Sequence, residues 1–179
     1  MKLEGQVRIP SGCAIAAVIS KEGKKMTGDT VIAGMVPMHD RSNGLGGGFA
    51  GYGIYPEYRA CYAFHIFFRD NLSRKNCEEF LKEGFEIVRA EDIPIRKIPE
   101  ITDLPLIWRY FVIPFGSTLS RLQLDEKEYV VRMVTRINTA IDGAYVFSSG
   151  KNMGVFKAVG FPEDVGRFYR LDRYEGYSW

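Results

Sequence analysis

Apolar residues recur at the 3.6-residue spacing of an amphipathic helix in three stretches of the chain. The first begins near Thr27 and is weakened near its end by Pro37. The second covers residues 73–88, and the third begins at Asp125, with Glu128 completing a capping-box pattern. The apolar stripes of these predicted helices are Val31, Ile32, Met35 and Met38; Cys77, Phe80, Leu81 and Val88; and Val130, Met133, Val134, Ile137 and Ile141.

Shorter apolar runs rich in Val, Ile and aromatic residues predict strands at 13–20, 59–69, 106–113, 144–149 and 153–158. The first of these holds small residues, which predict a buried strand with close packing on one face. A tight turn at 150–152 joins the last two runs in a predicted β-hairpin. Three prolines in 89–105 predict an extended connector.

Residues 43–53 hold six glycines in eleven positions. So dense a run predicts a loop whose backbone needs positive φ or a close approach to another chain segment or ligand. A phosphate-binding loop is the weaker interpretation. No predicted strand feeds the run directly, and neither a Gly-Lys-Ser/Thr sequence nor a helix start follows it.

The segments from residue 59 to residue 149 alternate strand, helix, strand, helix, strand. This βαβαβ order predicts an α+β fold, with a ferredoxin-like layer of sheet covered by two helices. The length of 179 residues fits a single domain with one core.

The charge balance and the shortness of the apolar runs argue against two classes of partner, nucleic acids and membranes. The chain is 46% hydrophobic and 26% charged, as in an ordinary globular protein. Its 24 Lys and Arg against 22 Asp and Glu leave a charge of only +2, so we expect no nucleic-acid partner. The apolar run 14–19 is far shorter than the roughly 20 residues that span a bilayer. Residues 1–10 lack a signal-peptide core, so we expect no membrane partner either.

Three cysteines without CxxC spacing predict neither a disulfide framework nor a zinc site, and favour a reducing, cytoplasmic compartment. Cys61 lies inside an aromatic strand and Cys77 on a helix stripe, so both are expected in the core. His39 and His65 are isolated in sequence and are expected at the surface or in the core rather than as ligands. No metal and no cofactor are therefore expected.

Cys13 directly follows a Ser-Gly turn, and two interpretations of it stay open. In the first it is a small apolar core residue, the common fate of a free cysteine. In the second it is an N-terminal nucleophile, exposed by removal of residues 1–12. Its α-amine, with a pKa of about 8, would then take the thiol proton directly or through a water without any histidine. Such a thiolate attacks a carboxamide, releases ammonia and leaves a thioester for water to hydrolyse.

Residues 9–19 (Ile-Pro-Ser-Gly-Cys-Ala-Ile-Ala-Ala-Val-Ile) resemble the start of class II glutamine amidotransferase domains. The resemblance is strongest to the stand-alone archaeal and bacterial relatives of glutamate synthase domain 1. Further segments are similar in order along the chain: 27–41 to the first helix of the family, 44–53 to its Gly-Asp-Gly-Ala-Gly loop, 144–160 to a hairpin before a Tyr-Lys-Gly segment, and 168–172 to a Phe-Tyr-x-Asp-Leu stretch.

This resemblance implies a fold and an activity. The fold is the N-terminal-nucleophile sandwich, two packed antiparallel sheets between helix layers in αββα order, with 59–149 as an insertion or a part of it. Residues 1–12 would be a leader or propeptide, and residues 13–179 the N-terminal part of the amidotransferase domain. Cys13 would be the catalytic residue and glutamine the substrate. The ammonia would pass to a synthase subunit or domain that makes glutamate from 2-oxoglutarate.

The sequence also departs from the family. A strand like 177–179 leads in the family to an Arg-Phe-Ser/Thr-Thr-Asn motif that grips the glutamine carboxylate, and later to an Asn-Gly pair that forms the oxyanion hole. Neither is present here, and the glycine run lacks the family's aspartate. Only Cys13 can be carried over, and we expect the chain to be truncated and inactive alone. The alternative is a non-catalytic, ferredoxin-like small-molecule-binding or regulatory module with Cys13 in its core.

Overall fold

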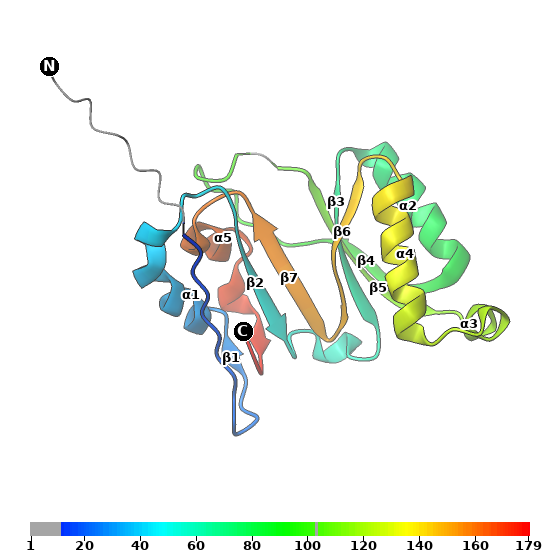
Figure 1. Cartoon of the computed structure of the whole chain (residues 1–179), viewed down its shortest axis with the longest axis horizontal. Coiled ribbons are helices and arrows are strands. Elements are labelled where there is room, and N and C mark those ends of the chain that lie inside the picture. Colours follow the sequence, from blue (N-terminus) through cyan, green and yellow to red (C-terminus); the bar gives the residue numbers. More distant parts are fainter. Residues whose placement is uncertain (1–11, 103) are drawn as a thin grey trace, which may run out of the picture.

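The structure of the chain is a computed structural model that describes residues 12–102 and 104–179 (Figure 1). The predicted leader, residues 1–12, therefore lies outside the described residues except for Gly12. The fold is α+β with antiparallel sheets, as expected. Its elements form two parts that pack against each other, a larger one on the right of Figure 1 and a smaller one on the left.

The larger part is a four-stranded antiparallel sheet in the order β4-β5-β3-β6, with α2 and α4 on one face. Its elements are β3 (Tyr62–Phe68), α2 (Asn71–Gly84), β4 (Phe85–Asp92), β5 (Leu106–Pro114), α3 (Gly116–Leu122), α4 (Glu126–Ala140) and β6 (Ala144–Lys151). This is the split βαβ, or ferredoxin-like, topology. The predicted ferredoxin-like layer is therefore confirmed. The simple βαβαβ order at 59–149 is wrong, because β4 and α3 are additional elements.

Strand β3 is apolar except for His65, and both of its faces are buried. Phe64, Ile66 and Phe68 pack with α2 and α4 in one core cluster. Ala63 belongs to a second cluster, shared with the smaller part, and Phe67 packs against it. A strand buried on both faces shows a nearly continuous apolar run rather than an alternation, as the sequence does here on either side of His65.

The structure confirms the expected start of the third predicted helix, α4, and corrects the expected end of the second, α2. The Asp125 carboxylate accepts a hydrogen bond from the Glu128 amide at 2.8 Å, which confirms the cap of α4. Helix α2 ends at Gly84, so the assignment of Val88 to its stripe is wrong and Val88 lies in β4. A Cβ on Gly84 would stand 2.0 Å from the Tyr129 hydroxyl, so only glycine lets α4 pack there.

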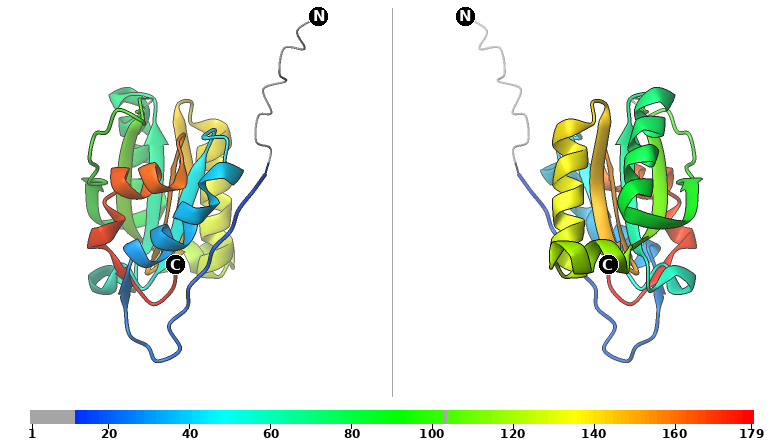
Figure 2. Two further views of the ribbon diagram at one scale, coloured as in Figure 1. Left: turned by 90° about the vertical axis from the view of Figure 1, so that its left-hand side faces the viewer. Right: turned by 90° about the vertical axis from the view of Figure 1, so that its right-hand side faces the viewer.

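The smaller part is built on β2 (Gly47–Tyr52), which pairs with β7 (Met153–Ala158) in antiparallel register. Residues 177–179 bridge Tyr52 on one side and residues 18–20 on the other. Helices α1 (Asp29–Met35) and α5 (Pro162–Phe168) lie together on one face of this sheet (Figure 2). The remaining elements are β1 (Met26–Thr27), β8 (Glu175–Gly176) and the 3-10 helices η1 (Val36–Arg41), η2 (Pro56–Tyr58) and η3 (Leu171–Arg173). The change from α1 to η1 next to Pro37 confirms the predicted weakening.

The glycine run is a strand over most of its length, so the predicted loop is wrong from Gly47 to Tyr52. The glycines are needed because other segments come close. A Cβ on Gly48 would lie 2.8 Å from the Phe156 carbonyl, and one on Gly51 would lie 2.8 Å from the Trp179 ring. Only the flanking Gly44 and Gly53 have positive φ, 71° and 86°.

The predicted hairpin at 144–158 is also wrong. The chain does turn at Asn152, which has a φ of 51°. However, β6 pairs with β3 and β7 pairs with β2, so the two runs belong to different sheets. The backbone groups of Val155 that a hairpin partner would bind are taken by the side chains of Ser148 and His65.

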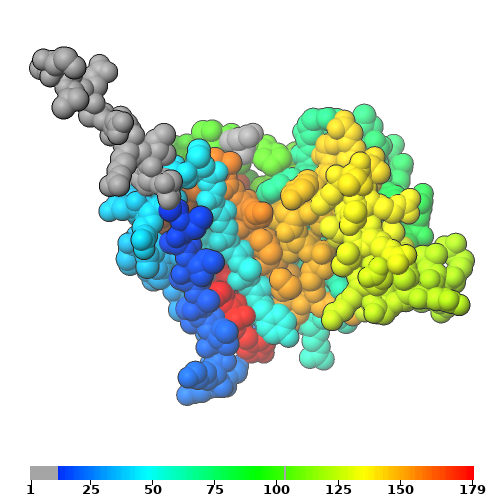
Figure 3. Space-filling model, in the orientation of Figure 1, coloured from blue at the N-terminus to red at the C-terminus, as the bar shows by residue number. Residues whose placement is uncertain are grey.

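One face of the smaller sheet is covered and the other is open. Phe49 packs towards Gly166 of α5 and is buried. Ile19 and Tyr52 pair with opposite sides of Ser178, so their side chains share the other face, where both are exposed. Figure 3 shows residues 12–20, β2 and β7 at the surface on this side. Among the described residues, the smaller sheet thus has a helix layer on one face only. The larger sheet does not cover its other face.

Candidate functional site

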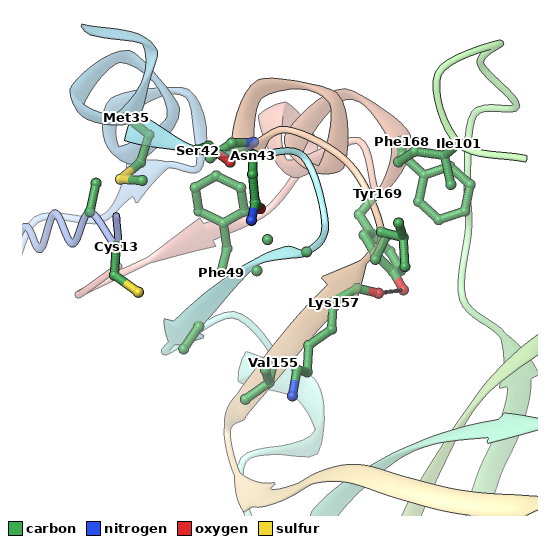
Figure 4. A pocket seen from close by; sticks show the side chains of 18 of the residues that line it. Cys13, Met35, Ser42, Asn43, Phe49, Ile101, Val155, Lys157, Phe168 and Tyr169 are labelled. Carbon is green, nitrogen blue, oxygen red and sulfur yellow. Dashed lines mark hydrogen bonds between the residues drawn. The ribbon is translucent and has the colours of Figure 1, made fainter. Parts of the chain in front are cut away.

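A cavity of about 1100 Å³ runs along the upper end of the smaller sheet and reaches the larger sheet (Figure 4). One wall is formed by Gly12, Cys13 and Ala14 and another by the start of β2. Phe67 and Ile107 of the larger sheet and Val155 and Lys157 of β7 also line it. The lining is mostly apolar, with few polar side chains, as is usual for small-molecule sites.

Cys13 stands exposed on the wall of this cavity. The predicted buried strand at 13–20 is wrong, since residues 12–18 form no strand and only Ile19 makes a β-bridge. The segment follows the edge of the smaller sheet, with its odd-numbered residues 13–19 exposed and its even-numbered ones partly buried. The interpretation of Cys13 as a core residue is therefore wrong too. Its thiol is accessible, as a nucleophile requires.

The other two cysteines are core residues, as predicted. Cys77 is fully buried, and burial raises the pKa of its thiol to about 12. Cys61 is also buried, and burial is the main cause that raises its thiol pKa. Because thiolates rather than thiols are nucleophilic, neither competes with Cys13.

Neither histidine lines the cavity. His39 stacks on Phe161 at 4.1 Å between ring centroids and pairs with Glu163 through its Nδ1. His65 is fully buried between the two parts. In the described part of the chain, then, Cys13 has no histidine beside it in the cavity to act as a base.

His65 belongs to a buried polar cluster with Tyr55, Arg109, Glu91 and Tyr174. Burial lowers the pKa of His65 to about 3, so its imidazole is neutral. Nδ1 donates to the Val155 carbonyl at 2.7 Å, which leaves Nε2 to accept from the Tyr55 hydroxyl at 2.9 Å. Burial also raises the pKa of Tyr55.

Arg109 completes this cluster from β5. Its guanidinium lies 4.8 Å from the centroid of the Tyr55 ring, bonds the Tyr174 hydroxyl at 3.3 Å and pairs with Glu91. Burial raises the pKa of Glu91, but the hydrogen bonds and charges of Arg109 and Arg89 together lower it more, so the net shift is downward. These contacts connect the two parts and lie outside the cavity lining.

The polar side chains of the cavity are few. Ser42 and Asn43 accept the amides of Gly44 and Leu45, at 3.2 and 3.1 Å, and so shape the turn before β2. Lys157 is the charged residue of the lining, and among the described residues no carboxylate pairs with it. Its ammonium is thus available to a ligand carboxylate.

Sequence reasoning singled out Cys13 but missed Lys157 and the start of β2. The glycine run did carry a signal, since close approach to another segment or a ligand was one of its two interpretations. Lys157 carried none, because a lysine in a strand with alternating pattern is ordinarily a solvated residue.

The described residues hold neither a metal-binding cluster nor a membrane-spanning helix. Residues 12–102 and 104–179 hold no group of three or more His, Cys, Asp or Glu side chains placed to bind a metal ion. Their helices include none that is both long and apolar enough to cross a membrane.

The chain matches no known family profile. It is similar to an uncharacterized protein of Archaeoglobus fulgidus, with 46% identity over 170 residues. The similarity covers 93% of this chain but 45% of that protein, so the chain spans less than half the length of its relative.

Proposed function

We propose that this chain carries the nucleophile of a glutaminase of the class II amidotransferase type, with Cys13 as the attacking residue. The observation that supports it most is the exposed Cys13 thiol on the wall of a large cavity with no histidine in its lining. An α-amine on Cys13 itself would supply the missing base.

The reaction follows from this arrangement. The α-amine takes the Cys13 thiol proton, and the thiolate attacks the carboxamide carbon of glutamine. The tetrahedral adduct collapses, the C–N bond breaks, and nitrogen leaves as ammonia after it accepts the proton. A water molecule then hydrolyses the thioester, which releases glutamate and restores the thiol. A synthase subunit or domain would receive the ammonia.

The cavity suits a small polar substrate in two further respects. Lys157 offers an ammonium to the substrate's carboxylate. The apolar side chains of Met35, Phe49 and Phe168 in the lining suit the methylene groups of the substrate.

The smaller part also suits the proposed family. Residues 18–20, 177–179, β2 and β7 lie side by side with α1 and α5 on one face. In the proposed αββα sandwich this is one sheet with its helix layer, and the open face of the sheet would receive the second sheet. The larger part would then be an insertion.

A second function is supported by the larger part. Its β4-β5-β3-β6 order is the ferredoxin-like topology expected of a small-molecule-binding or regulatory module. This candidate function does not use the Cys13 thiol. Reaction of Cys13 with a glutamine analogue therefore distinguishes it from the glutaminase function.

The test uses protein purified from its native host and 6-diazo-5-oxo-L-norleucine, an electrophilic glutamine analogue. We expect one adduct per chain, located on Cys13 by peptide mass spectrometry and prevented by excess glutamine. Cys13→Ala should abolish labelling, while Cys61→Ala, a matched control at a buried cysteine, should retain it. Labelling that persists in Cys13→Ala would refute the assignment.

A further inference from the structure

The outer edge of β7 is closed by side chains rather than by another strand. Tyr52 directs its N–H and C=O towards residues 177–178, so the facing pair of Tyr52 and Met153 exchanges no hydrogen bond. Because such pairs alternate in an antiparallel ladder, the backbone groups of Val155 and Lys157 also point away from β2.

Three side chains bind these groups. The Ser148 hydroxyl accepts from the Val155 amide at 3.1 Å, and His65 Nδ1 donates to the Val155 carbonyl at 2.7 Å. The Tyr169 hydroxyl donates to the Lys157 carbonyl at 2.8 Å. They come from β6, β3 and the end of α5.

All three side chains are buried, which makes the arrangement rigid. His65 and Tyr169 have no exposed surface, and Ser148 has 7%. Hydrogen bonds in such surroundings are strong, and leaving one of their partners unpaired is costly. A strand edge held in this way cannot slide or add another strand without breaking them.

The two residues held are among those that β7 contributes to the cavity lining. Val155 and Lys157 line it on the far side of β2 from Cys13 (Figure 4). A displacement of β7 would move the Lys157 ammonium relative to the Cys13 thiol. Displacements of about 1 Å at a reacting centre cost up to about a hundredfold in rate.

We infer that His65, with Ser148, is a positioning residue that fixes the β7 wall of the Cys13 cavity, which makes the ferredoxin-like part a component of the site. This inference rests on the proposed glutaminase function. It assigns the larger part a role in substrate alignment rather than in a separate activity.

The experiment compares two rates of Cys13 modification in the protein from its native host. One reagent is 6-diazo-5-oxo-L-norleucine, which must be aligned by the cavity. The other is iodoacetamide, which needs only an accessible thiol. We expect His65→Leu to slow the first by about tenfold or more and to leave the second within about threefold.

His65→Asn should restore the rate with the glutamine analogue, because the asparagine amide nitrogen can occupy the place of Nδ1 and donate to the Val155 carbonyl. Tyr55→Phe is the matched control. It removes the hydrogen bond to Nε2 but leaves the bond to Val155, so both rates should stay near wild type. If His65→Leu fails to fold, Ser148→Ala provides the same comparison.

The positioning role would be overturned if His65→Leu slowed modification of Cys13 equally with both reagents. It would also be overturned if His65→Leu and Ser148→Ala left the rate with the glutamine analogue unchanged. Wild-type protein that reacts with iodoacetamide but never with the analogue would overturn the glutaminase function and this inference together. Wild-type labelling without any effect of the variants would overturn this inference alone.

Discussion

Gly154 and Gly46 differ in what surrounds them, and the difference predicts opposite tolerance of a methyl group. A Cβ on Gly154 would lie 2.5 Å from the His65 ring and 2.9 Å from the Tyr55 hydroxyl. A Cβ on Gly46 would meet nothing within 4 Å. We expect Gly154→Ala to lower the free energy of unfolding by about 1–3 kcal/mol. Gly46→Ala should stay within about 0.5 kcal/mol of wild type in the same urea titration.

His65 makes stability depend on pH. Its pKa is about 3 in the folded chain, against an ordinary value of 6.5. Between these two values the unfolded chain binds a proton that the folded chain does not, so the free energy of unfolding falls as pH falls. For one proton the slope approaches about 1.4 kcal/mol per pH unit.

Chemical unfolding at several pH values between 4.5 and 7 measures this slope. Carboxylates add to it at the acid end, so the comparison is with His65→Asn, which does not titrate. We expect a shallower slope in the variant. Parallel curves for the two proteins would show that His65 is not buried as a neutral group.

Lys157 is expected to bind the substrate's carboxylate. Lys157→Met should raise the concentration of 6-diazo-5-oxo-L-norleucine needed for half-maximal labelling rate by about tenfold, the scale of one lost hydrogen bond to a charged group. Lys157→Arg keeps the charge and should lose less. If Lys157→Met left the half-maximal concentration of the analogue unchanged, Lys157 would not bind the substrate.

At the scale of elements, the cap of α4 gives a simple test. The Asp125 carboxylate bonds the Glu128 amide at 2.8 Å. Asp125→Ala should cost about 1 kcal/mol of unfolding free energy, while Asp125→Ser, which can also cap, should cost much less. Equal losses in the two variants would mean that the side-chain bond does not contribute.

The sequence predicted the elements with strong periodicity and missed those set by tertiary contacts. The stripe of α4 predicted its buried face correctly, with Val130, Met133 and Ile137 buried. The end of α2 was missed because Val88 fits helical spacing, whereas the chain from Phe85 onward is extended and pairs with β5. Strand β2 was missed because its glycines carry no apolar pattern, and their role depends on Phe156 and Trp179.

The candidate site was foreseen in one residue only. Cys13 was singled out by its Ser-Gly turn and by the family resemblance, but its exposure was not foreseen, because its apolar neighbours suggested a buried strand. Lys157 reaches the cavity through pairings of β7 that join residues far apart in sequence. Such long-range pairings cannot be read from local patterns.

At the scale of the whole molecule, β6 and β7 connect the two parts. They are consecutive in sequence but hydrogen-bonded in different sheets. Between the parts, the neutral His65 and its partners replace the missing strand pairing. This arrangement explains how a ferredoxin-like part of four strands can be joined to the smaller sheet without an exposed strand edge at the junction.

The central claim is that Cys13 acts through its own α-amine, and the mass of the mature chain tests it most directly. In protein purified from its native host, intact-mass and N-terminal peptide spectrometry should show a chain that begins at Cys13, and that species should carry the glutamine-analogue adduct. A chain that hydrolyses glutamine while residues 1–12 are still attached would contradict the account.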